Sequence, residues 1–102
     1  MKYLDDMGPH TRGPWIWYRS NTVGFDIRSQ SSGFAPIAKV KGDKRTTLAD
    51  AQANACLIAA APDMLESLYA LVDLFAHDKD ENIVKAVNKA KFAISIAEGK
   101  RL

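Results

Sequence analysis

The spacing of apolar residues changes once along this chain, near residue 42, and that change constrains the fold more than any other feature. Before it, Val23, Phe25 and Ile27 alternate with other residues, which is the period of a half-buried β-strand. After it, apolar residues recur every three or four positions, as in an amphipathic helix. Strands followed by helices are typical of an α+β protein. We therefore expect a sheet within residues 15–40 and helices within 48–99.

The first half of the chain predicts a three-stranded antiparallel β-meander, because short aromatic and β-branched runs alternate with turn-forming residues. The expected strands are 15–19, 23–28 and 34–40, separated by turns at 20–22 and 30–33. In the third strand we expect Phe34, Ala38 and Val40 on one side of the pleat. Pro36 lacks an amide hydrogen, which indicates an edge strand or a bulge.

An alanine-rich helix is expected next, with a proline in or beside it. Thr47 can cap its N-terminus, and the helix should run from Leu48 to about Ala61. Pro62 removes one main-chain donor, so either the helix kinks there or a new helix begins with this residue. Cys56 is expected to be a small buried side chain in this helix. The face expected to pack on a neighbour consists of Ala49, Ala53, Leu57 and Ala60.

The last part of the chain predicts an antiparallel helical hairpin. Past the proline, an apolar stripe continues at Met64, Leu65, Leu68, Leu71, Val72 and Phe75. The polar segment 77–80 interrupts it, Asp80 can cap the last helix, and Gly99 fits that helix's C-terminal end. The seam expected to face the neighbouring helix consists of Ile83, Val87, Ala90, Ile94 and Ala97.

The length of 102 residues fits one domain. We divide the chain into an irregular arm at 1–14 and a single α+β domain at 15–102. One cysteine allows no intramolecular disulfide. The chain has no uninterrupted run of about 18 apolar residues, and its N-terminus lacks the apolar core of a secretory signal. We therefore expect a protein of the cytoplasm with no membrane partner.

The sequence contains no recognisable catalytic or metal-binding pattern. His10 and His77 lack the spacing of zinc ligands, the six glycines form no phosphate-binding loop, and no G-x-S-x-G elbow occurs. The net charge of +2 is too small to indicate nucleic-acid binding by itself. We therefore predict no catalytic residue, no metal site and no cofactor, and a protein that is not an enzyme.

The candidate ligand-binding residues are mainly aromatic and basic side chains of the predicted sheet. Trp15, Trp17 and Arg19 should share one strand face, and Arg28 alternates with the apolar residues of the next strand. A tryptophan ring can stack on a nucleobase while an arginine binds phosphate oxygens. The alternative is that the tryptophans pack in the core. Asn54, which is polar within the alanine-rich helix, either ties a neighbouring backbone group or contacts a ligand.

The segment N-A-C-L-I-A-A-A-P-D-M-L, from Asn54 to Leu65, resembles a signature of small accessory proteins of tailed phages and prophages, N-A-x-L-I-A-A-A-P-x-L-L. Cys56 stands where many such proteins have arginine. The order of strands, alanine–proline helix and final helix is also similar to that of the anti-Thoeris sponges. This resemblance implies a multimeric protein that sequesters a cyclic nucleotide-type immune signal without cleaving it, and it makes Asn54 a candidate contact.

Three functions remain open at this point. The leading one is such a sponge in the host cytoplasm, acting as a homo-oligomer because the short sheet cannot cover every apolar helix face. The second is an inhibitor of a host defence protein complex, such as a CRISPR effector, that binds through exposed tryptophans. The third is weak binding of nucleic acid by the basic last helix, through Lys85, Lys89 and Lys91. Nucleic acid is the least favoured of the three partners.

Overall fold

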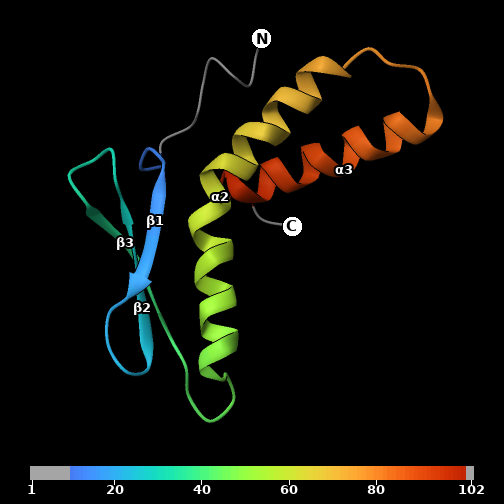
Figure 1. Cartoon of the computed structure of the whole chain (residues 1–102). Coiled ribbons are helices and arrows are strands. Elements are labelled where there is room, and N and C mark those ends of the chain that lie inside the picture. Colours follow the sequence, from blue (N-terminus) through green and yellow to red (C-terminus); the bar gives the residue numbers. More distant parts are fainter. Residues whose placement is uncertain (1–9, 101–102) are drawn as a thin grey trace. The chain divides into compact units, whose positions relative to one another are not determined.

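A computed structural model describes residues 10–100 of the chain (Figure 1). It contains a three-stranded antiparallel sheet followed by two helices, which confirms the predicted α+β class. The elements are β1 (Trp15–Arg19), β2 (Gly24–Ser29), β3 (Ala35–Lys41), α2 (Leu48–Leu74) and α3 (Glu81–Ala97). Of the irregular arm expected at 1–14, residues 1–9 lie outside the described part of the chain.

β2 is the middle strand and pairs with β1 on one side and β3 on the other. The first pairing opposes Trp17 to Ile27, and the second opposes Ile27 to Ala38. The second register shifts between Ile27 and Arg28, so that Pro36 lies opposite Arg28. The proline therefore stands in an edge strand beside a bulge, as its missing amide hydrogen predicted.

The third strand begins one residue later than expected, and Phe34 is not part of it. Gly33 and Phe34 have positive φ angles of 65° and 59°. This left-handed backbone interrupts the alternation of the strand, and the Phe34 side chain is 52% exposed. The expectation that Phe34 shares a side with Ala38 and Val40 is therefore wrong, whereas Ala38 and Val40 do pack on the core.

Two compact units divide the described residues. The first spans Thr11–Asp63 and holds the sheet with the first part of α2. The second comprises His10 and residues 64–100, which include the rest of α2 and all of α3. Each unit has its own cluster of buried apolar side chains. The buried core is thus in two parts.

The first unit packs small side chains of α2 against the sheet. Its buried cluster consists of Phe25 and Ile27 from β2 and Ala51, Ala55 and Ala59 from α2. Trp15, Ile37 and Leu48 are among the half-buried residues that surround it. Alanines at every fourth position allow the helix backbone to approach the strands closely, because they lie on one side of the helix.

The packing face of α2 differs from the expected one. Ala49 and Ala53, which were expected on that face, are exposed, and Leu57 is 61% exposed. Alanine occupies so many positions of this segment that the apolar period cannot select a face. Cys56, expected to be buried, is also exposed, because it follows the buried Ala55 by one position and so points away from the sheet.

α2 continues through Pro62 as one helix, so the proline does not separate two helices. At its N-terminus the Thr47 hydroxyl accepts a hydrogen bond from the Asp50 amide at 3.1 Å, which confirms the expected cap. Pro62 is buried, and Gly13 lies against it: a Cβ added to Gly13 would be 3.0 Å from the Pro62 Cβ. This close approach favours glycine at position 13.

The second unit is a helical hairpin whose core confirms Val87, Ala90 and Ile94 of the predicted seam, whereas Ala97 is exposed and Ile83 lies outside the core cluster. Its buried cluster is Tyr69, Val72 and Ile94, with Leu65, Leu68, Val87 and Ala90 packed around it. The Asp80 side chain accepts hydrogen bonds from the amides of Asn82 and Ile83, at 2.9 and 3.3 Å, and so caps α3. Gly99, with a φ of 91°, follows the helix end.

From the sequence we expected no membrane-spanning segment, but α2 is long and apolar enough to cross a membrane by length and composition alone. The core helix of a soluble protein passes the same criterion, and 22% of the apolar window is buried. α2 also carries Asp63 and Glu66 near its middle, where charge is costly in a bilayer. That the protein has no membrane partner therefore stays a prediction.

Candidate functional site

The sheet has one face toward α2 and one face away from it. Phe25 and Ile27 point toward α2 and belong to the core. Alternation along the strands and the strand register place a different set of side chains on the opposite side, which we call the outer face. The polar side chains that define the outer face are Tyr18, Asp26, Arg28 and Lys39.

Both tryptophans lie on the side of the sheet that faces α2, because the register aligns them with inward residues of β2. Trp15 packs against the core cluster, and its indole N–H donates a hydrogen bond to the Thr11 carbonyl at 3.1 Å. Trp17 is 38% exposed and meets the Phe25 ring edge-on, with centroids 5.7 Å apart. Both rings contribute to packing, and Trp17 keeps part of its surface accessible.

Arg19 shares the face of the tryptophans and holds the turn that follows β1. Its Nε donates to the Asn21 carbonyl at 3.0 Å and its Nη2 to the Thr22 carbonyl at 2.8 Å. Asn54 is exposed on α2. The structure therefore brings the three predicted residues of β1 together on one face and places Arg28 on the other. The five predicted binding residues do not converge on one site.

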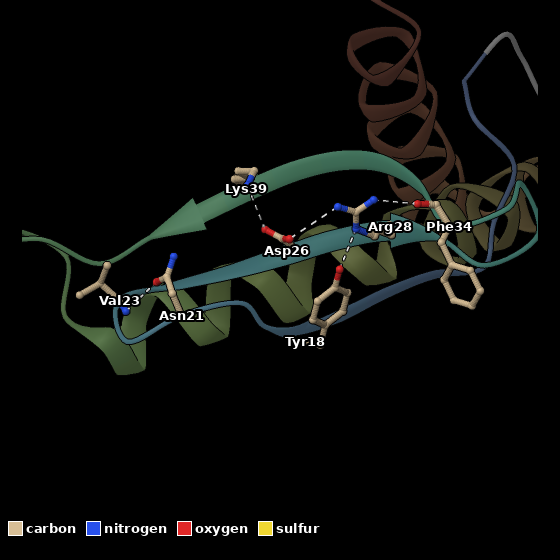
Figure 2. Close-up of polar contacts among 7 residues, drawn as sticks. All are labelled: Tyr18, Asn21, Val23, Asp26, Arg28, Phe34 and Lys39. Atoms are coloured by element: carbon tan, nitrogen blue, oxygen red, sulfur yellow. Dashed lines mark hydrogen bonds and ion pairs between the residues drawn. The ribbon is translucent and has the colours of Figure 1, made fainter.

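Arg28 is the centre of a polar network on the outer face (Figure 2). Its Nε donates to the Tyr18 hydroxyl at 2.7 Å, and its Nη1 donates to the Phe34 carbonyl at 3.1 Å. Its Nη2 lies 3.9 Å from Oδ2 of Asp26. The guanidinium thus connects β1, β2 and the turn before β3, and its plane is fixed by three partners on different segments.

Asp26 is the buried acidic group of the outer face. Its side chain is 11% exposed, and it lies between Arg28 and Lys39, whose Nζ is 3.8 Å from Oδ1 (Figure 2). Among the described residues, no donor lies within hydrogen-bonding distance of Oδ1. Buried carboxylate oxygens normally accept hydrogen bonds, because their desolvation is otherwise uncompensated. Asp26 therefore retains acceptor capacity that the described protein atoms do not use.

A small polar pocket adjoins this carboxylate. It has a volume of about 90 Å³ and is lined mainly by the polar residues Ser20, Asn21, Asp26, Lys39 and Lys41. Gly24 contributes backbone to its wall, where an added Cβ would lie 3.1 Å from the Val40 carbonyl oxygen. Asn21 also shapes the pocket, because its Oδ1 accepts the Val23 amide at 2.9 Å (Figure 2). The pocket combines one carboxylate with two lysines.

In the connector that leads to α2, the carboxylate of Asp43 is held in place by main-chain amides. Oδ1 of Asp43 accepts hydrogen bonds from the amides of Thr46 and Arg45, at 2.9 and 2.7 Å. These two bonds, first that of Thr46 and then that of Arg45, lower the pKa of the Asp43 carboxyl below its ordinary value, because they stabilise the charged form. Asp43 therefore organises the loop rather than the outer face.

Sequence reasoning identified Arg28 but missed its neighbours on the outer face. Alternation along β2 already placed Asp26 on the same side as Arg28. Alternation along β1 likewise placed Tyr18 on the other side of the strand from Trp17 and Arg19. Those signals were available and pointed to one face. Lys39 could not be assigned, because its pairing with Asp26 depends on where the bulge shifts the register of β3.

The outer face carries charged and aromatic groups of the kind that can contact a ligand. Within residues 10–100, no group of three or more His, Cys, Asp or Glu side chains is placed to hold a metal ion. The site instead offers a carboxylate acceptor, a guanidinium, two ammonium groups and a phenol ring. These groups can bind an anionic ligand that also carries N–H donors.

Comparison with known proteins links the chain to phage proteins. A family model described as Salmonella phage P22 protein Y8K6 matches residues 1–101. Comparison with curated proteins and with solved structures found no match.

Proposed function

The chain belongs to the family of Salmonella phage P22 protein Y8K6, and from this premise we propose that it is a small phage protein that acts by binding and not by catalysis. The outer face is its binding site, and the ligand is a nucleotide-type anion. In its leading form the protein is a sponge that sequesters a cyclic nucleotide-type immune signal in the host cytoplasm. Sequestration requires affinity without turnover, which suits a site with binding groups alone.

The observation that carries this proposal is the buried carboxylate of Asp26. Its Oδ1 is buried without a hydrogen-bond donor among the described residues, and Asp26 is one of the residues that line the polar pocket. Nucleobases present amino and imino N–H groups that could supply the missing hydrogen bond. A charge-assisted hydrogen bond of this kind is worth about 1.5–3 kcal/mol, enough to select such a ligand.

The basic groups around the pocket supply the second half of the recognition. Arg28, Lys39 and Lys41 surround a single carboxylate, so the site has an excess of positive charge. Phosphate oxygens can accept hydrogen bonds from these groups. Tyr18 is 40% exposed and held in place by Arg28, and its ring can stack on a base. The proposed stacking residue is thus Tyr18, whereas the sequence had suggested Trp15 or Trp17.

A calorimetric titration with a panel of cyclic mononucleotides, cyclic dinucleotides and cyclic ADP-ribose isomers tests the proposal. We expect saturable binding of at least one compound, which is recovered intact. Arg28→Gln and Asp26→Asn should each weaken that binding at least about tenfold, because each removes a charged partner. Arg19→Gln is the matched control: it removes an arginine from the other face and should leave the affinity unchanged.

Two results would contradict the nucleotide proposal. One is a panel that shows no heat of binding with folded protein at millimolar ligand. The other is binding that Arg19→Gln weakens as much as Arg28→Gln does. Circular dichroism and thermal melting of each variant separate a lost contact from a lost fold.

Direct contact with a host defence protein is the second candidate, and the exposed aromatic side chains favour it. Tyr18 and Phe34 are 40% and 52% exposed, and both connect to Arg28. Aromatic and arginine side chains are common anchors of protein interfaces. An inhibitor of this kind would bind a protein and give no response to the nucleotide panel.

A further inference from the structure

The helical hairpin of the second unit leaves much of its apolar surface uncovered. Its buried cluster holds three side chains, Tyr69, Val72 and Ile94. Large apolar side chains elsewhere on the two helices are exposed, including Leu71 at 50% and Phe92 at 53%. Helices of this length gain most of their stability from the packing of an apolar face. The hairpin therefore has more apolar surface than its own core uses.

Part of this surface is concentrated on one side of the hairpin. On α2, Met64, Leu71 and Phe75 recur with spacings of seven and four residues and are 43%, 50% and 36% exposed. A groove of about 220 Å³ runs between this stripe and the start of α3, where Ile83 and Ala86 form its other wall. The two helices thus share one apolar side.

On α3 the same side continues with small residues. Ala93 and Ala97 follow Ala86 at spacings of seven and four, and all three are exposed. The hairpin face is therefore defined by Met64, Leu71 and Phe75 of α2 and Ala86, Ala93 and Ala97 of α3. Of the charged side chains of the two helices in this unit, Lys89 borders the face, because it lies three residues after Ala86 and four before Ala93. The others occupy other helical positions: Glu66, Asp73, Glu81, Lys85 and Lys91.

We propose that the hairpin face binds a second copy of this chain and forms a symmetric four-helix bundle. A two-fold axis parallel to the helices would place α2 of each copy over α3 of the other. The large side chains of α2 then lie against the alanines of the partner's α3, so the face is complementary to itself in size. Every neighbouring pair of helices is antiparallel in this arrangement, as in up-and-down bundles.

The size of the face is sufficient for such a contact. α3 has 17 residues and is therefore about 25 Å long. Two packed helices are about 20 Å wide, so each copy offers on the order of 500 Å² and the pair buries roughly 1,000 Å². Specific interfaces begin at about this size. Lys89 at the border of the face can cover apolar surface with its methylene groups while its ammonium group stays in water, which limits the cost of desolvation. The association does not depend on a ligand on the outer face.

Sedimentation velocity over a range of protein concentrations tests the proposal. We expect the wild-type chain to reach a mass of twice 11.2 kDa. Leu71→Lys should raise the dimer dissociation constant at least about tenfold, because it buries a charge in the contact. Glu66→Lys is the matched control, since Glu66 lies on the same helix, is exposed and, five residues before Leu71, lies on another side of it.

A second variant guards against effects on the hairpin itself. Ala93 is exposed, so Ala93→Glu should preserve the helical circular dichroism signal while it also dissociates the dimer. A wild-type protein that stays monomeric at submillimolar concentration would overturn the proposal. So would a dimer that Glu66→Lys weakens as much as Leu71→Lys, or one that Ala93→Glu leaves intact.

Discussion

Phe34 shows how a single backbone angle limits what a residue can contribute. Its φ of 59° is unfavourable for a side chain with a Cβ, by roughly 1 kcal/mol, and its ring is largely exposed. Phe34→Gly should therefore raise the free energy of unfolding by up to about 1 kcal/mol, and the Phe34 carbonyl should still accept from Arg28. Urea denaturation measures the change.

The neighbouring position provides the opposite control. Gly33 has a φ of 65°, and a Cβ added there meets no atom within 4 Å. Gly33→Ala should therefore lower the free energy of unfolding by about 1 kcal/mol through backbone strain alone. A Gly33→Ala protein as stable as wild type would contradict the strain argument for both residues.

Asp43 makes the stability of the loop before α2 depend on pH. Its carboxyl pKa is lower in the folded state, so its contribution is present above the ordinary carboxyl pKa and is lost as pH falls through the folded value. Asp43→Asn should therefore be less stable than wild type at neutral pH, with a difference that shrinks below about pH 4. Urea midpoints of both proteins at pH 7 and pH 3 check this, and the same difference at both pH values would refute it.

At the scale of elements, the contact between α2 and the sheet depends on side-chain size at every fourth position of α2. Ala55 is fully buried against β2. Ala55→Leu should destabilise the protein by about 1–3 kcal/mol, because the added carbons have no space. Ala53→Leu, on the exposed side of the same helix, should change stability by less than about 0.5 kcal/mol. Equal effects in thermal denaturation would show that the packing face has been assigned incorrectly.

Features set by local chemistry were predictable from the sequence, and features set by tertiary contact were not. The caps at Thr47 and Asp80 involve amides within three residues, so the residue types alone indicate them. The buried face of α2 was assigned wrongly, because alanine fits both a packed and an exposed side of a helix. The left-handed Phe34 has no signature in residue type, since left-handed positions usually carry glycine or asparagine.

The same division holds for the candidate site. Alternation correctly separated Arg28 from Phe25, since strand period is a local property. It could not show that Arg19 and Arg28 would lie on opposite faces of one sheet, which follows from the pairing of Arg19 with Phe25. A site built from residues on different strands requires the register, and here a bulge changes the register partway along β2.

At the scale of the whole molecule, the two proposed surfaces belong to different compact units. The outer face lies in the first unit, and the hairpin face lies in the second. Leu71→Lys should therefore remain able to bind a ligand with wild-type affinity, and Arg28→Gln should remain dimeric. Calorimetry and sedimentation on both variants test this, and loss of both properties in either variant would show that the surfaces are coupled.

Asp26 also affects which competing anions the outer face can exclude. The bacterial cytoplasm, which is the proposed location, is crowded with RNA. A sheet that displayed Arg28, Lys39 and Lys41 with no acid among them would attract any polyanion. The buried carboxylate subtracts one charge at the centre of that cluster and repels phosphates that bring no hydrogen-bond donor. In the proposed binding role, selectivity against RNA would thus rest on the single acidic residue of the site.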